Sequence, residues 1–406
     1  MSRESYRYVL VGGGLAAARA AEGIRELDPD GSVLIVGEEP RLPYHRPPLT
    51  KGLLLGKKKP EDVYCKSEQF FQEKRVTVWT GVSALRLEPG ARAVTLGNGG
   101  QVGYEKLLLA TGCRARRLDL PGAGLKGIFT VRTLNNSLEL LASMKKARRA
   151  VVIGGSYIGA EVASALSQNG VATTMVFPER RLLGSLVDEE LGGFLDSLYA
   201  RNGVAIRAGV KPVRFKGEGE LTGVVTDAGE EIPADLAVLG VGAVLNNTLA
   251  SQGGLSMAEG GGVRVDGHLE TSVQGVYAAG DIAEVPDPTY GKRFRLEHWD
   301  SAFRQGHLAG RNMAGAGENF SALPHYFTTL FDCGLSVWGD FSGWDRTLRA
   351  GELGKKGSWI FYLQKGELRG ILAFDPVEKE EEARIEELVH RRIPESEVRA
   401  CASKVA

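Results

Sequence analysis

The chain has 406 residues, which is long enough for two or three domains. Of these residues 43% are hydrophobic and 25% are charged, as is usual for globular proteins. Its 50 basic and 50 acidic residues balance, which argues against nucleic acid or an anionic membrane as its main partner. Glycine is enriched, at 54 of 406 residues, about 13% against roughly 7% in average proteins. We therefore expect many tight turns and close approaches of backbone to ligand.

The N-terminus leads directly into a strand-like apolar stretch, residues 6–11, with no signal-peptide core or cleavage site. No stretch approaches the ~18 apolar residues of a membrane span. We expect a cytoplasmic protein. The cysteines Cys65, Cys113, Cys333 and Cys401 lack CxxC spacing, and the histidines lack metal-ligand spacing. Neither a disulfide framework nor a metal site is predicted.

A strand, glycine turn, helix and strand occur in this order twice. The first copy has a turn at residues 12–14, a helix predicted over 15–27 and a strand over 32–36. The second has a turn at 154–156, a helix predicted over 157–169 and a strand over 172–176. This pattern is typical of Rossmann units, in which a pyrophosphate meets the helix N-terminus. Two copies predict an α/β fold with two nucleotide sites.

Further strands are predicted at 106–109, 236–239 and 275–279, each followed within three residues by a glycine. From about Pro324 the pattern becomes antiparallel, with strands at 335–341, 358–364 and 368–374. A charged helix is predicted over 377–392. We interpret this tail as a separate small α+β domain.

The two glycine turns differ in detail. In the first, Gly12 permits the turn, Gly14 admits a pyrophosphate, and Glu38 follows the next strand, where a carboxylate suits ribose hydroxyls. In the second, Ser156 replaces the middle glycine, and Glu179 stands two residues beyond the usual acidic position. A carboxylate there would repel a 2′-phosphate, so NADH is predicted over NADPH, although the arginines at 180 and 181 argue the other way.

The segment of residues 43–51 (PYHRPPLTK) resembles a motif of the FAD-dependent ferredoxin reductase family. This family includes reductases of Rieske oxygenases and cytochromes P450, rubredoxin reductases, monodehydroascorbate reductase and apoptosis-inducing factor. The resemblance continues, in the family's order, through residues 110–112, 129–132, 159–161, 176–179, 240–242, 279–281 and 296–299.

The resemblance implies a glutathione-reductase-like fold of three domains. Residues 1–113 and 245–323 would form an FAD-binding domain, residues 114–244 an NAD(P)H-binding domain, and residues 324–406 a C-terminal α+β domain. It also implies FAD and NADH as cofactors.

The resemblance assigns roles residue by residue. Glu38 would bind the FAD ribose, Arg46 its phosphates and Asp281 its ribitol chain, while Lys51 and Glu161 would form a catalytic ion pair beside the reactive flavin edge. The residues expected on the FAD side are Gly12, Gly13, Gly14, Leu15, Ala16, Ala17, Glu38, Glu39, Arg46, Lys51, Val82, Thr111, Gly112, Arg132, Gly280, Asp281, His298, Trp299 and Phe327. Those expected on the NAD side are Gly154, Gly155, Ser156, Tyr157, Ile158, Gly159, Glu161, Glu179, Gly242 and Glu297.

Two positions depart from the family's pattern. Phe327 replaces the tryptophan of an aromatic-Trp-Ser sequence, and Val244-Leu245 replaces an arginine–proline pair. Both weaken assignment to one subfamily.

The resemblance implies an NAD(P)H-dependent flavoprotein reductase that takes hydride from NADH and passes electrons singly to a ferredoxin or rubredoxin. Because the chain has no cysteine cluster for an iron–sulfur centre, the acceptor should be a separate protein. The alternatives are NADH-dependent reduction of a small molecule, as in monodehydroascorbate reductase, and a redox-sensing flavoprotein like apoptosis-inducing factor. Both a monomer and a homodimer fit.

Overall fold

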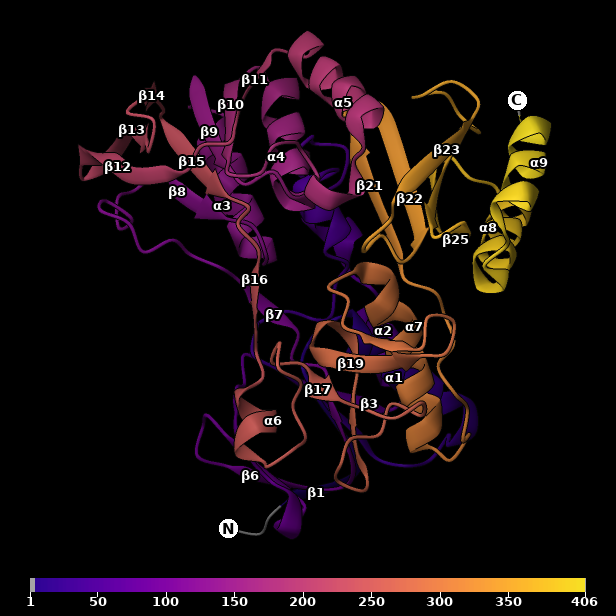
Figure 1. Cartoon of the computed structure of the whole chain (residues 1–406). Coiled ribbons are helices and arrows are strands. Elements are labelled where there is room, and N and C mark those ends of the chain that lie inside the picture. The colour runs from indigo at the N-terminus through magenta and orange to yellow at the C-terminus, as the bar shows by residue number, and fades with distance from the viewer. Residues whose placement is uncertain (1–3, 406) are drawn as a thin grey trace. The chain divides into compact units, whose positions relative to one another are not determined.

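The computed structural model describes residues 4–405, and the chain folds into two compact units (Figure 1). The first comprises Met1–His45, Glu61–Arg114 and Val244–Pro324, and the second comprises Arg46–Pro60, Ala115–Ala243 and His325–Ala406. The second unit thus holds both the predicted NAD(P)H-binding and the predicted C-terminal segments. The three-domain division stays a prediction.

The first unit is built on a sheet with the strand order β3-β2-β1-β6-β5-β4, and β18 pairs with β6. Its strands are β1 (Glu4–Val11), β2 (Val33–Gly37), β3 (Val76–Thr80), β4 (Ala84–Glu88), β5 (Ala93–Leu96), β6 (Gln101–Leu109) and β18 (Val276–Ala278). The β3-β2-β1-β6 part is parallel. The chain continues from β1 to β2 on one side, whereas β6 pairs with β1 on the other side. A topological switch point therefore falls at the carboxyl end of β1, where such sheets bind ligands.

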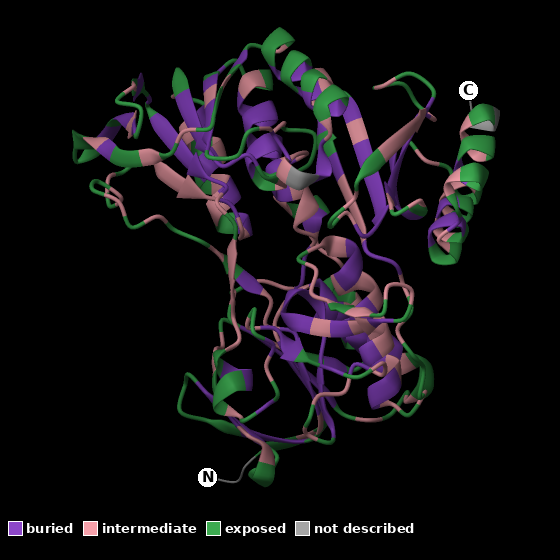
Figure 2. Cartoon of the chain, in the orientation of Figure 1, coloured by how far each residue is buried: buried purple, intermediate pink, exposed green. Residues whose placement is uncertain are grey.

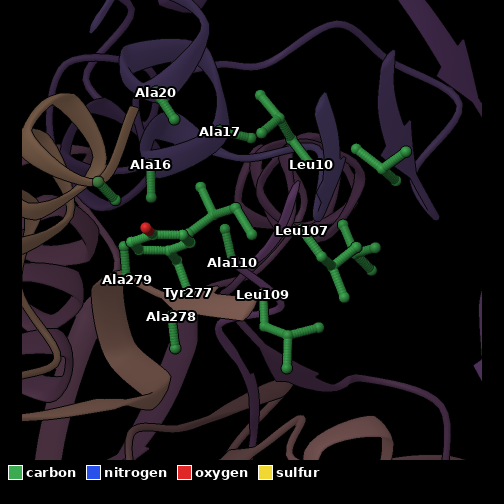
Figure 3. Close-up of a cluster of buried hydrophobic side chains, with 14 of the residues drawn as sticks. Leu10, Ala16, Ala17, Ala20, Leu107, Leu109, Ala110, Tyr277, Ala278 and Ala279 are labelled. Atoms are coloured by element: carbon green, nitrogen blue, oxygen red, sulfur yellow. The ribbon is translucent and has the colours of Figure 1, made fainter. Parts of the chain in front are cut away.

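Two helices of the first unit, α1 (Leu15–Leu27) and α7 (Trp299–Met313), pack at close range. A Cβ added at Gly306 or Gly310 would overlap the carbonyl oxygen of Ala16 or Ala20, respectively. Figure 3 shows the short side chains Ala16, Ala17 and Ala20 of α1 in the buried cluster with residues of β6 and β18. Small residues therefore set the spacing between α1 and α7.

Smaller elements complete the first unit. They are α2 (Glu68–Glu73), α6 (Thr248–Gln252) and a three-stranded sheet of β17 (Val263–Arg264), β19 (Ala283–Asp287) and β20 (Lys292–Phe294). The short strands β7 (Cys113–Ala115) and β16 (Ala243–Leu245) pair where the chain passes from one unit to the other.

The second unit contains a parallel sheet with the strand order β11-β10-β9-β15-β8. Its strands are β8 (Ile128–Thr130), β9 (Arg149–Ile153), β10 (Ala172–Phe177), β11 (Val204–Ala208) and β15 (Leu236–Leu239). Its helices are α3 (Leu134–Met144), α4 (Tyr157–Gln168) and α5 (Glu189–Arg201), and β12 (Pro212–Glu218), β13 (Glu220–Thr226) and β14 (Glu231–Pro233) form an added antiparallel sheet. A switch point again falls beside the strand, β9, that precedes the glycine turn.

The C-terminal part of the second unit is an antiparallel sheet with the order β21-β22-β25-β24-β23, followed by two helices. The elements are β21 (His325–Leu330), β22 (Cys333–Gly339), β23 (Arg346–Ala350), β24 (Trp359–Gln364), β25 (Glu367–Phe374), α8 (Lys379–Arg391) and α9 (Glu395–Val405). In Figure 2 the central strands of the sheets are largely buried, and the outer helix faces are exposed.

The predicted fold class is confirmed, with two parallel Rossmann-like sheets and an antiparallel tail. The helix predicted over 15–27 has those bounds, and the one predicted over 157–169 ends one residue earlier. Three tail elements, β21, β23 and α9, were not predicted. Among residues 4–405, no helix is long and apolar enough to cross a membrane.

The close packing of α1 on α7 predicts that one methyl group added between the two helices lowers the stability of the protein. Gly310→Ala should destabilise the protein by about 1–3 kcal/mol, because the new Cβ meets backbone rather than a movable side chain. The matched control is Gly193→Ala in α5, where an added Cβ has nothing within 4 Å, and helix propensity predicts a gain of about 0.5–1 kcal/mol. Denaturant unfolding of both variants tests this, and a Gly310→Ala protein as stable as wild type would contradict it.

Candidate functional site

The first glycine turn leaves an open space above the N-terminus of α1. Gly12 has φ +128°, and a Cβ there would overlap the carbonyl oxygen of Ala110, so glycine is required by the fold itself. Gly14, the N-cap of α1, has nothing within 4 Å of an added Cβ and makes no side-chain cap. The first-turn N–H groups, from Leu15 onward, have no helical acceptors. This arrangement fits a dinucleotide phosphate.

The two acidic residues after β2 differ in their surroundings. Glu38 is exposed and accepts a long hydrogen bond of 3.4 Å from the Ser83 hydroxyl. Glu39 accepts a 2.5 Å hydrogen bond from the Tyr44 hydroxyl. Glu38 is therefore the better placed of the two to accept from ribose hydroxyls. Val82 lies beside them, its backbone N–H donating to Gly37.

Two loops of the first unit that carry predicted FAD residues are fixed by groups outside the predicted set. The Thr111 hydroxyl donates to the Asn246 carbonyl (2.6 Å), and the Asn246 amide donates back to the Thr111 carbonyl (3.0 Å). Asp281, only 8% exposed, accepts from the Cys113 thiol at 3.1 Å. The preceding residue, Gly280, donates its N–H to Gln305.

The predicted residues 297–299 introduce helix α7. His298 is its N-cap and accepts from the N–H of Asp300 at 3.3 Å. The Trp299 indole N–H donates to His45 Nδ1 at 2.9 Å, and its ring stacks on Phe303 with centroids 4.8 Å apart. Glu297 pairs with Arg295 at 2.7 Å. Trp299 is thus held in one orientation.

The second glycine turn repeats the first with altered chemistry. Gly154 has φ +115°, and a Cβ there would overlap the Gly240 carbonyl oxygen. The Ser156 hydroxyl donates to that same oxygen at 2.9 Å, so it is engaged with the backbone. Phe177, fully buried, lies against Gly155, whose added Cβ would be 2.8 Å from the ring. The ring supports the turn from the position where an acidic residue is usual.

A buried carboxylate, Glu161 of α4, joins three segments of the second unit. Lys51 Nζ lies 2.7 Å from Oε1, and the Thr328 hydroxyl of β21 donates to the same oxygen at 2.7 Å. The Thr50 hydroxyl, from the short 3₁₀ helix η1 (Pro47–Thr50), donates to Oε2. The side chains of Glu161 and Lys51 are 6% and 19% exposed. A buried charge is tolerated when it is paired and hydrogen-bonded in this way.

Aromatic rings adjoin this carboxylate. Lys51 Nζ lies 5.6 Å from the centroid of the Phe327 ring, within cation–π range. Tyr157, the first residue of α4, stacks parallel to Tyr326 with centroids 6.2 Å apart. Burial raises the pKa of Tyr157 well above its ordinary value, and the charges of Tyr326 and Glu161 act in the same direction. The Tyr157 hydroxyl therefore stays protonated at physiological pH.

The two predicted FAD arginines of the second unit lie together. Arg46 donates from its guanidinium to the backbone carbonyl of Arg132, and both side chains are partly buried. Of the remaining predicted residues, Gly159 packs against the backbone of Gly154, Ile158 is 38% exposed, and Gly242 has φ +92°.

A cavity of about 550 Å³ lies beyond the end of β10 and includes Glu179, the predicted ribose acceptor. Its lining residues are Glu179, Arg180, Arg181, Gly184, Val187, Asp188, Glu189 and Trp344. Arg181 lies 3.3 Å from Glu189 and 3.9 Å from Asp196, so much of its charge is balanced by carboxylates.

Sequence reasoning missed the two threonines on Glu161, the role of Asn246 and the cavity wall at Trp344. Thr50 precedes Lys51 and Thr328 follows Phe327 in the sequence, and that adjacency was the available signal. Among residues 4–405, no group of His, Cys, Asp or Glu side chains is arranged to hold a metal ion.

Two glycine turns, each at the switch point of its own parallel sheet, together with a buried ion pair define an oxidoreductase that works with two nucleotides. The chain belongs to the pyridine nucleotide-disulphide oxidoreductase family, whose model matches residues 6–306. The predicted resemblance to the ferredoxin reductase family is confirmed by this match together with the reductase relatives.

Characterised relatives match along most of the chain. The ferredoxin–NAD(+) reductase component of the anthranilate 1,2-dioxygenase system of Burkholderia cepacia is 32% identical over 360 residues, covering 88% of this chain and 87% of that protein. Rhodocoxin reductase of Rhodococcus erythropolis is 31% identical over 365 residues, covering 89% and 85%. The covalent putidaredoxin reductase–putidaredoxin complex contains a chain that superposes with a TM-score of 0.90 at 27% identity, covering 97% of this chain and 94% of that one.

The contrast between Gly12 and Gly14 separates folding from nucleotide binding. Gly14→Ala should leave the unfolding free energy of the apoprotein nearly unchanged, because the added methyl group meets no protein atom within 4 Å. It should lower the ratio of flavin to protein absorption after purification, because the methyl group takes the space expected for the pyrophosphate. Gly12→Ala should destabilise the apoprotein itself. A Gly14→Ala protein with wild-type flavin content and affinity would contradict this assignment.

Proposed function

We propose that this protein oxidises NADH and delivers the electrons one at a time to a small iron–sulfur protein of the ferredoxin type. The balanced reaction is NADH plus two oxidised ferredoxins giving NAD⁺, two reduced ferredoxins and one proton. Bound FAD would accept two electrons together from NADH and release them one at a time to the iron–sulfur protein. The family membership and the names of the reductase relatives support this proposal.

The observation that carries the proposal is the buried Glu161 with its lysine and two threonine donors. The Lys51 ammonium favours an increase of negative charge in its neighbourhood, which is what reduction of a flavin requires. Glu161 holds that ammonium at a fixed position, and the threonine hydroxyls hold the carboxylate. The electrostatic environment is therefore set before the reaction begins.

The first unit supports FAD as the resident nucleotide. The open space at Gly14 and the exposed Glu38 suit a pyrophosphate and a ribose, and the buried Asp281 suits a hydroxyl of the ribitol chain. Of the second unit's residues, Arg46 and Arg132 are proposed to neutralise phosphate charge, as the resemblance implies.

The cavity beyond β10 supports NADH over NADPH. Glu179 lines this cavity, and its carboxylate is proposed to repel a 2′-phosphate and to accept from the free 2′-hydroxyl of NADH. Arg181 is opposed by Glu189 and Asp196, which reduces its attraction for a phosphate. We therefore propose NADH as the physiological donor.

Anaerobic stopped-flow of the purified flavoprotein tests the proposal. NADH should bleach the visible flavin band at least tenfold faster than NADPH at equal concentration, and oxidised [2Fe–2S] ferredoxin added afterwards should restore the band. Slow bleaching with a persistent long-wavelength band that ferredoxin does not remove would contradict a reductase role. Faster bleaching by NADPH would overturn only the assignment of Glu179.

A further inference from the structure

The cavity beyond β10 has one wall that comes from a distant part of the chain. Seven of its lining residues belong to the stretch 179–189, which follows β10, whereas Trp344 belongs to the loop between β22 and β23. All of them lie within the second unit. The C-terminal sheet thus contributes an indole to a cavity that otherwise belongs to the Rossmann-like sheet.

Trp344 is held against this cavity by a buried tyrosine. The Tyr362 and Trp344 rings form a T-shaped pair, with centroids 5.6 Å apart and an interplanar angle of 79°. The hydroxyl of the same tyrosine donates to the Leu186 carbonyl at 2.7 Å. Tyr362 is fully buried, so one side chain connects the indole to the backbone of the stretch 179–189.

Asp188 connects the stretch 179–189 with β23 of the C-terminal sheet. As the N-cap of α5 it accepts from the N–H of Leu191, and its other oxygen accepts from the Thr347 hydroxyl at 2.8 Å and from the Arg349 guanidinium. Burial alone would raise the pKa of Asp188. The hydrogen bonds from Leu191 and Thr347 and the charge of Arg349 together outweigh burial, so the pKa lies below its ordinary value. The stretch that follows β10 is thus hydrogen-bonded to β23.

We propose that Trp344 is the stacking surface for the adenine ring of the nicotinamide nucleotide. This inference rests on the proposed function, because it assumes that a nicotinamide nucleotide binds the second unit. In a Rossmann unit the acidic residue after the second strand binds the adenosine ribose, which brings the adenine close to Glu179. Glu179 and Trp344 line the same cavity, and its volume of about 550 Å³ lies within the ~300–1,000 Å³ of small-molecule pockets.

The chemistry of the wall suits a flat, uncharged base. An indole face offers stacking to any purine and repels no part of it, while the carboxylates and arginines of the cavity suit the ribose. Trp344 is therefore assigned a binding role at the adenosine end, remote from the hydride-transfer end of the nucleotide. It should affect the affinity for NADH and leave the reaction step alone.

The test uses AMP, which carries only the adenosine end. For Trp344→Ala, calorimetry on the holoenzyme should give a roughly tenfold weaker AMP affinity, the order expected of one base–aromatic stack. The KM for NADH should rise by a similar factor, and kcat at saturating NADH should stay within about twofold of wild type. Trp344→Phe, which keeps an aromatic face, should retain most of the affinity. Unchanged AMP affinity in Trp344→Ala would overturn the assignment.

A second measurement does not depend on the alanine variant folding. AMP should quench part of the tryptophan fluorescence of the wild-type protein, and Trp344→Phe should abolish that quenching while still binding AMP. Quenching that persists in Trp344→Phe would overturn the proposal. A wild-type protein that NADH reduces rapidly but that does not bind AMP would overturn the adenine assignment alone, whereas failure of NADH to reduce the wild-type protein would refute the proposed function.

Discussion

The carboxylate of Glu161 is the constraint on which the arrangement of the second unit depends. It is buried, and its oxygens accept from η1, from Lys51 and from β21, segments that lie more than 100 residues away in the chain. A buried carboxylate stripped of its partners costs several kcal/mol, so these segments must keep their relative positions. Two neighbouring contacts reinforce them, from Ser137 to the Leu49 carbonyl and from Asn169 to the Leu54 carbonyl. These contacts explain why Arg46–Pro60, which follows the first Rossmann strands in sequence, belongs to the second unit.

The glycine turns and the ion pair make different contributions to the candidate site. The turns are backbone devices that provide space and N–H groups, and their glycines are required because carbonyl oxygens stand where a side chain would begin. The ion pair is a side-chain device that provides fixed charge. At the second turn Phe177 packs against Gly155, and Glu179, two residues later, lines the cavity beyond β10.

Much of the fold was predictable because its signals are local. The glycine turn, the alanine-rich helix after it and the short apolar strand fix the bounds of α1 and β2 closely. The tail was harder. β21 and β23 carry polar or charged residues on both faces, so apolar and polar residues do not alternate clearly in their sequences, and α9 is a short helix rich in charge. The pairing of Lys51 with Glu161 followed from family resemblance. The threonines at 50 and 328 and the indole at 344 depend on contacts between distant segments, which spacing along the chain does not encode.

The central claim, that Lys51 and Glu161 act as one unit, is tested most directly by a double-mutant cycle on the rate of NADH-dependent bleaching. Lys51→Met and Glu161→Gln keep side-chain volume, and thermal melts establish that each variant is folded. The account predicts that each single variant slows bleaching and that the double variant is little slower than the worse single variant, a coupling of about 0.5–3 kcal/mol. A double variant whose loss equals the product of the single losses would contradict the account, because the two charges would then act independently.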